Sequence, residues 1–447
     1  MNVSRRQMRS PRAAGAATGP PPRRPGPPLR RVGALLGASV LAVSALAACG
    51  TGNASTGPVT LTFYLYPDNS GATDTAIKNC DQQSNGKYTI SYQKLPNSSD
   101  GQRTQLVRRL AAKDSTIDIM GLDVTWEAEF AEAGWLVPWT GVNKAQAENG
   151  TLQTSVNTAV WKGKLYAVPD NTNTQLLWYR SDLVPNPPKT WAEMLADAAA
   201  LAKQGKPHYI EIQGNQYEGA TVWFNTMVAS AGGTILNPDA TKVTLSSPAV
   251  KALSIMHQLA SSPAADPSLP VQMENENRLA MEAGTAAFEL NYPFVYPAMK
   301  LDNPELFKSF KWALYPEVIP GQPAKVTIGG IDFGISSYSQ HKALAFQAAL
   351  CLRDKQNQII GANVGGVPPT ITSLYNDPAL FKNYPFHADI LTALQNASVR
   401  PKTPVYQVVS IDISHLVSPA SAISPASTQQ SLISQLNNAL QSKGLVP

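Results

Sequence analysis

The chain has 447 residues, 43% hydrophobic and 15% charged, so it is long enough for two globular domains rather than one. Its formal net charge of +5 at first suggests a nucleic-acid partner, but eight of its 36 Lys and Arg lie before residue 49, where there is no Asp or Glu. Subtracting those eight leaves 28 Lys and Arg against 31 Asp and Glu, a net charge of −3 for the rest. This mildly acidic body gives no electrostatic reason to bind nucleic acid.

Residues 1–48 predict a lipoprotein signal peptide. Arg30 and Arg31 precede VGALLGASVLAVSALAAC, an apolar run that is shorter than the roughly 20 residues of a spanning helix. Its ending, LAAC, resembles the bacterial lipobox, whose cysteine (here Cys49) is lipidated and becomes the first residue. An ordinary signal cut near the same alanines is the alternative. We therefore expect an exported chain, anchored by lipid to the outer face of the cytoplasmic membrane, with general and twin-arginine secretion both open.

A Gly-rich segment, residues 49–57, predicts a flexible tether, and strands and helices then alternate. This alternation indicates an α/β fold with a parallel sheet. The elements expected are a strand over 59–66, a helix through Ile77 and Cys80 that stops near Gly86, a strand over 87–95, a helix over 101–115, a strand over 116–123 and a short helix closed by Gly134.

The stretch from residue 164 to 205 predicts a stiff crossing from one lobe to another. Two extended runs, 165–168 and 175–179, are separated by a polar turn. Three prolines at 185, 187 and 188 then exclude both helix and paired strand. Thr190 and Glu193 form the capping box of a helix that ends at Gly205.

The second half continues the alternation. We expect strands over 208–214, 286–294 and 325–336; helices over 221–233, 246–260 (with Ser247 as N-cap and Pro248 in the first turn), 277–284 and 427–441; and one long amphipathic helix over 341–360.

Cys80 and Cys351 form an even pair in an exported chain, which favours a disulfide over two free thiols. Such a bond requires the segment around Cys351 to return to the N-terminal lobe.

Signatures of enzymes are missing. The sequence has no HExxH, Walker, GxSxG or GxGxxG motif, and its five histidines lack metal-ligand spacing, so we expect no cofactor and no metal. A carboxylate pair for glycoside hydrolysis is always available among 31 acids, so it indicates little.

Polar residues recur beside aromatic ones where predicted strands end. This pattern suits a sugar, whose C–H faces pack on aromatic rings while its hydroxyls pair with carboxylates and amides. The alternative is that these aromatics belong to the core. The instances are Tyr64 to Asn69, Asp123 to Trp126, Asn171 to Asn173, and Asn291 with Tyr292.

GKLYAVP and YRSDLVPNPPKTWAEM resemble the extracellular sugar-binding proteins of ABC importers, a likeness that extends over nearly all of residues 58–447. TNTQLLWYRSDLV, VWFNTMVASAGG, PGQPAKVTIGG and VRPKTPVYQ, together with the stretch from Asp100 to Trp135, resemble more closely the trehalose-binding lipoproteins of mycobacteria and related actinobacteria (LpqY type). The resemblance implies a monomer that is not an enzyme, with trehalose or a related disaccharide and ABC permease subunits as its partners.

The same resemblance implies a maltose-binding-protein type of fold, with two α/β lobes that close on the ligand. The first lobe is expected to hold residues 58–172 and 324–372, and the second 173–323 and 373–447. The Cys80–Cys351 bond would then lie within the first lobe.

Ligand-binding residues follow from the resemblance position by position. Asp123 would accept from hydroxyls, Arg400 would donate a fork of hydrogen bonds, and Gly330 would let the backbone approach the ligand. Tyr292 replaces a Trp of the mycobacterial relatives, and the segment between Met299 and Pro320 is shorter than theirs. The remaining candidates are Asn69, Asn171, Asn173 and Glu274, whose register against Glu276 is ambiguous.

Several alternatives stay open. Asp123 could cap the following helix, and Arg400 could form an ion pair on a lobe surface. The ligand could be another disaccharide such as maltose, or a trehalose derivative. The chain could instead be an extracellular glycosidase, or a lipoprotein that senses a sugar or docks a protein without transporting anything.

Overall fold

The computed structural model describes residues 57–381 and 383–442. The predicted signal peptide, its lipobox and almost all of the tether lie outside this range. Within the described residues, no helix is both long enough and apolar enough to cross a membrane.

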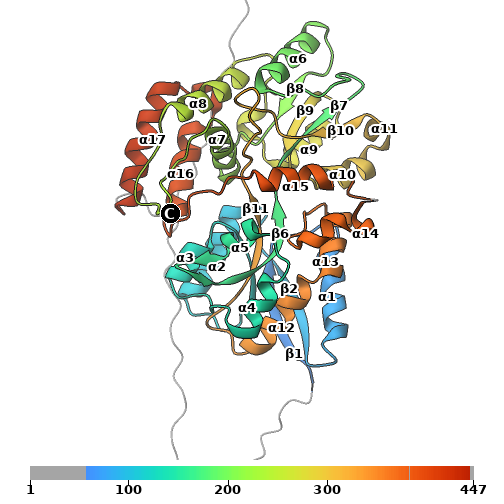
Figure 1. The fold of residues 1–447 in the computed structure, drawn as a ribbon, viewed down its shortest axis with the longest axis vertical. Coiled ribbons are helices and arrows are strands. Elements are labelled where there is room, and N and C mark those ends of the chain that lie inside the picture. The colour runs from blue at the N-terminus through green and yellow to red at the C-terminus, as the bar shows by residue number, and fades with distance from the viewer. Residues whose placement is uncertain (1–56, 382, 443–447) are drawn as a thin grey trace, which may run out of the picture. The chain divides into compact units, whose positions relative to one another are not determined.

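The first lobe is built on a five-stranded sheet in the order β2-β1-β3-β11-β6 (Figure 1). β1 runs parallel to β2 and β3, whereas β11 runs antiparallel to both β3 and β6, so the sheet is mixed and the expectation of a purely parallel sheet is wrong. The strands are β1 (Val59–Leu65), β2 (Tyr88–Lys94), β3 (Ile119–Asp123), β6 (Ala167–Asn173) and β11 (Gly329–Ile335).

Helices cover both faces of this sheet. Phe63 and its neighbour Tyr64 belong to different apolar clusters, as successive residues of a strand with two buried faces must. The helices of the lobe are α1 (Ala72–Gln83), α2 (Ser99–Ala111), α3 (Glu127–Glu132), α4 (Gly141–Glu148), α5 (Gln153–Thr158), α12 (Lys342–Leu352) and α13 (Lys355–Ile360), with a small hairpin of β4 (Val160–Trp161) and β5 (Lys164–Leu165).

The second lobe is built on a four-stranded sheet in the order β10-β7-β9-β8, in which only β8 and β9 pair in parallel. Its strands are β7 (Leu176–Arg180), β8 (Tyr209–Glu211), β9 (Ala286–Asn291) and β10 (Phe310–Ala313). The helices that follow in chain order are α6 (Trp191–Lys203), α7 (Glu218–Ser230), α8 (Ser247–Ala260), α9 (Glu274–Glu282), α10 (Val295–Asp302), α11 (Pro304–Phe307), α14 (Pro378–Phe381), α15 (His387–Gln395), α16 (Tyr406–Val417) and α17 (Pro425–Leu440).

The first crossing between the two sheets, from β6 to β7, is shorter than the sequence suggested. The polar run expected to form a turn is strand β6, which pairs with β11 up to Asn173, and only Thr174 and Gln175 separate it from β7. The prolines lie after β7 and lead into α6, so they do not link the sheets. The capping box of α6 is confirmed, since Thr190 Oγ1 accepts from Glu193 N at 3.1 Å.

Two helix predictions need correction. The N-cap of α8 is Ser246, not Ser247. The single helix expected over 341–360 is two helices, because buried Arg353 ends α12 by donating to Pro169 O at 3.1 Å, and Asp354 caps α13. A tertiary contact to β6 thus interrupts a continuous amphipathic pattern.

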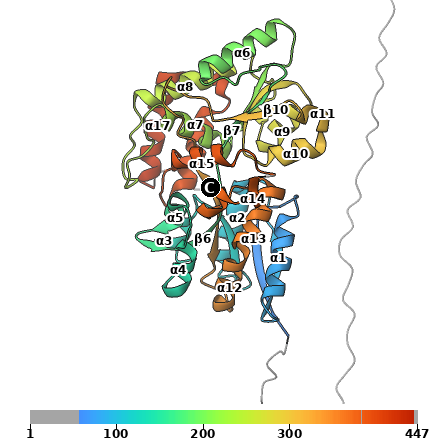
Figure 2. The same ribbon diagram turned by 45° about the vertical axis from the view of Figure 1, so that its right-hand side comes forward.

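Cys80 on α1 and Cys351 on α12 form a disulfide, as predicted. Helices α1, α12 and α13 lie along one side of the first lobe in both views (Figures 1 and 2). The bond therefore joins the first helix of the lobe to a segment that returns 271 residues later.

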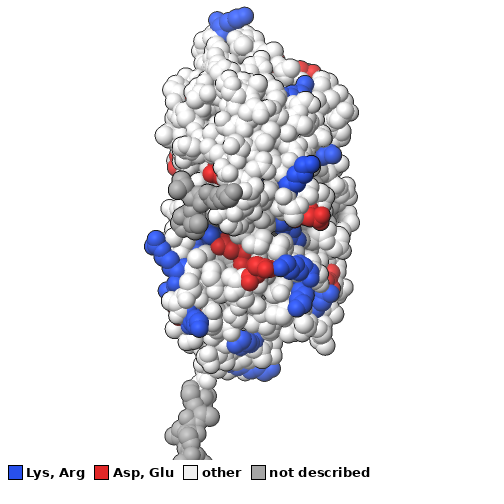
Figure 3. Space-filling model, turned by 90° about the vertical axis from the view of Figure 1, so that its left-hand side faces the viewer, with Lys and Arg blue, Asp and Glu red and all other residues white. Residues whose placement is uncertain are grey.

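Charged side chains are unevenly spread over the face of the molecule shown in Figure 3. Figure 3 shows Lys and Arg interspersed with Asp and Glu on the face that it presents, mostly over its lower part and its middle. Helix α17 contains no charged residue.

Two acids lie opposite each other inside the second lobe. Glu211 of β8 pairs in register with Glu289 of β9, and both are fully buried. Burial raises the pKa of each carboxyl to about 8, and the charge of Glu289 contributes to the shift of Glu211. Both acids therefore hold a proton at neutral pH in the folded chain.

Removing the disulfide should destabilise the fold. We expect the double variant Cys80→Ala/Cys351→Ala to lose about 2–4 kcal/mol in free energy of unfolding, because the unfolded chain regains the freedom of a very long loop. Urea denaturation measures the loss. A reducing agent should lower the wild-type midpoint but not that of the variant, and equal midpoints of wild type and variant would contradict the expectation.

The buried acids predict a stability that falls as the pH rises. Their folded pKa values exceed the unfolded ones, so the folded chain holds more protons, and stability is lost as the pH rises from about 5 through about 8. Glu289→Gln should flatten this slope and raise the free energy of unfolding at pH 8.5 by about 1–2 kcal/mol. The control is Glu305→Gln on the exposed part of α11, which should leave the curve unchanged.

Candidate functional site

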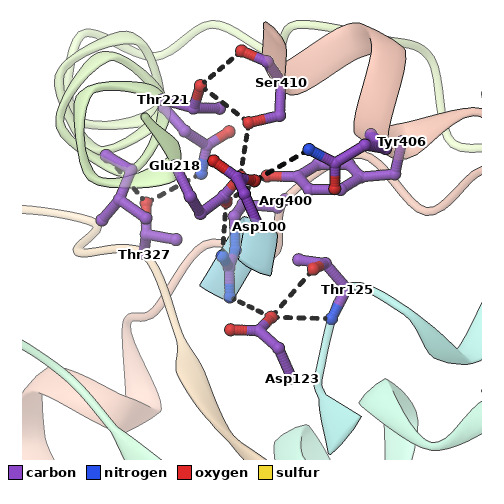
Figure 4. Close-up of polar contacts among 12 residues, drawn as sticks. Asp100, Asp123, Thr125, Glu218, Thr221, Thr327, Arg400, Tyr406 and Ser410 are labelled. Atoms are coloured by element: carbon purple, nitrogen blue, oxygen red, sulfur yellow. Dashed lines mark hydrogen bonds and ion pairs between the residues drawn. The ribbon is translucent and has the colours of Figure 1, made fainter. Parts of the chain in front are cut away.

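One guanidinium group joins three distant parts of the chain. Arg400, on the segment between α15 and α16, donates through Nη2 to Asp123 Oδ1 at 3.2 Å and through Nη1 to Glu218 Oε1 at 2.6 Å (Figure 4). Asp123 ends β3 of the first lobe, and Glu218 begins α7 of the second. Arg400 is only 5% exposed, so this is a buried link between lobes and not an ion pair on a lobe surface.

Glu218 is fixed by hydroxyl groups of α16. Tyr406 Oη donates to its Oε1 at 2.5 Å, and Ser410 Oγ donates to its Oε2 (Figure 4). Burial raises the pKa of Glu218, an effect that Arg400 opposes. Burial alone would lower the pKa of Arg400, but the carboxylates of Asp123 and Glu218 help to hold it well above its usual range, so Arg400 stays charged.

Asp123 keeps part of its carboxylate accessible, with its side chain 20% exposed. Its Oδ1 also accepts from the backbone N and the Oγ1 of Thr125, at 3.0 and 2.8 Å. This local turn fixes the side chain at the end of β3. The N-cap of α3 is Trp126, so the alternative that Asp123 caps this helix is wrong.

The edge between β11 and β6 lies beside Arg400. A Cβ atom on Gly329 would stand 4.0 Å from Arg400 Nη2 and 3.4 Å from the Cβ of Asn173. Gly330 has a φ of +141°, and a Cβ there would meet Asn171 O at 2.4 Å, so only glycine fits. The strand pairing by itself thus requires this glycine, whether or not a ligand approaches it.

Two polar atoms here are buried and unsatisfied. In the part of the chain that the structure describes, neither Asn173 Oδ1 nor Arg400 Nε has a hydrogen-bond partner. Because buried polar groups are nearly always paired, these atoms are candidates to bind a ligand.

Glu274 and Tyr292 face the same cluster from the second lobe. Burial and then the charge of Glu274 raise the pKa of Tyr292, and Arg400 acts on it in the opposite direction. Burial also raises the pKa of Glu274, with a smaller contribution from Asp123. Glu276 is exposed and accepts from the backbone of Met273, so Glu274 is the acid that reaches the cluster.

Buried amides hold these two residues in place. Asn291 Nδ2 donates to Glu274 O at 2.8 Å, and its Oδ1 accepts from Tyr292 N at 2.8 Å. From the crossing, Gln175 Nε2 donates to Gln213 Oε1 at 2.6 Å, and Gln213 Nε2 donates to Asn277 Oδ1 on α9 at 2.8 Å. The short crossing and the start of α9 thus share one network.

The structure groups six of the eight predicted site residues; Asn69 lies elsewhere, and Asn171 adjoins Gly330 through its backbone but turns its side chain to Asp170. Asn69 is exposed on the loop after β1, and the side chain of Asn171 donates to Asp170 Oδ2 at 3.0 Å. The grouped residues are Asp123, Asn173, Glu274, Tyr292, Gly330 and Arg400.

Sequence reasoning missed Glu218 and its neighbour Tyr217. Burial and then the charge of Glu274 raise the pKa of Tyr217 well above its usual range, which places it at the cluster. The sequence did contain the pattern of a polar residue beside an aromatic one after a strand, because Tyr217 and Glu218 follow the strand predicted over 208–214. Conversely, Tyr64 and Trp126 show the same pattern but are core residues, 6% and 3% exposed.

The chemistry of the cluster is binding by hydrogen bonds. Carboxylates, an amide and a guanidinium offer acceptors and donors to an uncharged ligand rich in hydroxyls, and Tyr292 adds an aromatic face. Within the described residues, no group of three or more His, Cys, Asp and Glu is arranged to hold a metal ion.

Comparison with known proteins gives one consistent result. The chain is 29% identical over 327 residues to a probable ABC transporter-binding protein of Deinococcus radiodurans, covering 70% of this chain and 77% of the relative. Its structure resembles maltose-bound MalE3 of T. maritima with a TM-score of 0.79 at 27% identity, covering 85% of this chain and 99% of that one. The GacH receptor of Streptomyces glaucescens, at 20% identity and a TM-score of 0.75 over 86% of this chain and 99% of that one, shares the fold.

The family model for bacterial extracellular solute-binding proteins matches residues 70–359, well over half of the chain. The two-lobed α/β fold described above is the one that the maltose-bound relative also has. The chain therefore belongs to the family of bacterial extracellular solute-binding proteins.

Proposed function

We propose that this protein captures a disaccharide between its two lobes and delivers it to an ABC permease. Trehalose is the first candidate for this disaccharide. The observation that carries the proposal is Arg400, which holds carboxylates of both lobes beside unsatisfied polar atoms. A sugar that replaces or joins these contacts stabilises the closed arrangement, and its differential affinity shifts the population of closed molecules.

Trehalose is proposed from the sequence resemblance to trehalose-binding lipoproteins, and the polar character of the cluster is compatible with it. The likeness to a maltose-bound protein makes maltose the first rival ligand. A trehalose derivative is the second, since Tyr292 offers a smaller face than the Trp of the mycobacterial relatives.

Delivery to a permease fits a receptor tethered to the membrane through a lipid on Cys49. The role of a sensor without transport is the remaining non-enzymatic alternative. A glycosidase is disfavoured because the chain belongs to a family of solute-binding proteins, and because Asp123 and Glu218, the acids closest to Arg400, both form ion pairs with its guanidinium.

The ligand assignment predicts a clear calorimetric result. Titration of the purified protein with trehalose, maltose, sucrose and glucose should show one-to-one binding that is tightest for trehalose. Binding of maltose alone would keep the receptor role and overturn the ligand. Breakdown of any of the four sugars on incubation would contradict a pure binding role.

The proposed role of Arg400 predicts that even a conservative substitution to lysine lowers the affinity for the sugar. Arg400→Lys should weaken trehalose binding by at least about tenfold, because an ammonium group cannot fork between Asp123 and Glu218. Arg180→Lys is the matched control, since Arg180 forms a comparable fork with Asp182, at 2.8 and 2.6 Å, away from the site. Equal affinities of both variants would exclude Arg400 from the binding site.

A further inference from the structure

Lys402 lies two residues after Arg400 and also reaches across to the first lobe. Its Nζ donates to the backbone carbonyl of Asn157, on α5, at 2.5 Å. Lys402 is partly buried there, with burial acting to lower its pKa.

The segment that carries Lys402 is attached to the second lobe on both sides. Before it, Ile328 N donates to Ser398 O at 2.8 Å, and the adjacent Thr327 bonds Thr226 and Asn225 of α7. After it, Tyr406 bonds Glu218 of α7. Lys402 therefore belongs to the second lobe, and its contact with Asn157 exists only when the lobes are together.

The first lobe contains, near enough to Lys402 to act on its charge, a pair of buried acids that the sugar-binding proposal does not use. Glu127 begins α3 and Asp332 lies in β11, and they are 0% and 1% exposed. Among the described residues, both oxygens of Glu127 and Oδ1 of Asp332 have no donor, while Asp332 Oδ2 accepts from Thr158 Oγ1 at 3.0 Å. Two carboxyls so close together cannot both be charged unless a cation approaches them.

The charges of both acids act on Lys402 and raise its pKa, in opposition to the effect of its burial. Burial and the charge of Asp332 raise the pKa of Glu127 well above its usual range, so Glu127 keeps its proton and Asp332 is the charged member. Burial raises the pKa of Asp332 to about 7; hydrogen bonds from Glu127 and Thr158 oppose this rise, and the charges of Asp123 and Asp170 add to it.

We propose that Lys402 is a second anchor between the lobes, which docks on Asn157 O beside the Glu127–Asp332 pair and stabilises the closed arrangement. The proposal rests on closure of the lobes around a sugar, as proposed above. Arg400 and Lys402 then contact the first lobe at two points from one short segment, and of these two side chains only Arg400 has a buried atom without a hydrogen-bond partner among the described residues. Lys402 is a positioning residue.

The anchor makes closure depend on pH. Above pH 7, Asp332 is charged and attracts Lys402; as the pH falls through about 7, Asp332 takes up a proton and the attraction is lost. Closing therefore releases a fraction of a proton, and both affinity and closure should be greater at pH 8 than at pH 6.

The test compares full-length protein, purified in detergent, as wild type, Lys402→Met and the exposed control Lys311→Met. Trehalose is titrated at pH 6, 7 and 8. Lys402→Met should bind about tenfold more weakly than wild type at pH 8, and its affinity should change less with pH. Asp332→Asn should bind at every pH as wild type does at pH 6. If Lys402→Met binds trehalose with the affinity and the pH dependence of wild type, the proposal that Lys402 anchors the closed lobes is wrong.

A second readout needs no sugar. Small-angle scattering of the ligand-free protein should give a smaller radius of gyration at pH 8 than at pH 6 for wild type and Lys311→Met, and no such difference for Lys402→Met. If wild type does not bind trehalose, the proposed ligand is wrong. The scattering comparison still tests whether Lys402 stabilises the closed arrangement. Identical scattering of wild type and Lys402→Met at both pH values overturns this role of Lys402.

Discussion

A buried positive charge cannot be left without partners, and Arg400 satisfies this requirement with carboxylates from both lobes. Its position between Asp123 and Glu218 is therefore a constraint on the whole molecule. It requires the end of β3, the start of α7 and the segment before α16 to meet. The hydroxyls of Tyr406 and Ser410 that hold Glu218, and the turn at Thr125 that holds Asp123, all serve this one arrangement.

The first crossing between the lobes, from β6 to β7, is short and is joined by hydrogen bonds to the candidate site. Only Thr174 and Gln175 separate the last strand of the first sheet from the first strand of the second. Gln175 begins a chain of buried amide hydrogen bonds that reaches α9, and Asn291 fixes Glu274 and Tyr292 through their backbones. A rotation at this crossing would act on groups that already contact the candidate site residues, so in the proposed function hinge motion and ligand recognition share one set of contacts.

Local patterns predicted the elements better than their pairing. Strands and helices alternating along the sequence identified β1, β2 and β3, and the capping box identified the start of α6. Both patterns depend only on residues close together in the sequence. The antiparallel insertion of β11 between β3 and β6 was missed, since it joins residues more than 150 positions apart. The break between α12 and α13 was missed for a similar reason, as Arg353 ends the helix by bonding to a distant strand.

By itself the sequence determined the amphipathic segments, the even cysteine pair and the residue types available for a polar site, because composition and spacing depend on no distant contact. It also pointed to Asp123 and Arg400 through resemblance. Only the tertiary structure decided that Glu218 is the second carboxylate bound by Arg400, and that Tyr64 and Trp126 are core residues. It also decided that Lys402 comes near the buried acids Glu127 and Asp332. Each of these depends on which surfaces the two sheets and their crossings bring together. A side chain's burial and charge partners arise from that packing, and the order of residues along the chain does not contain them.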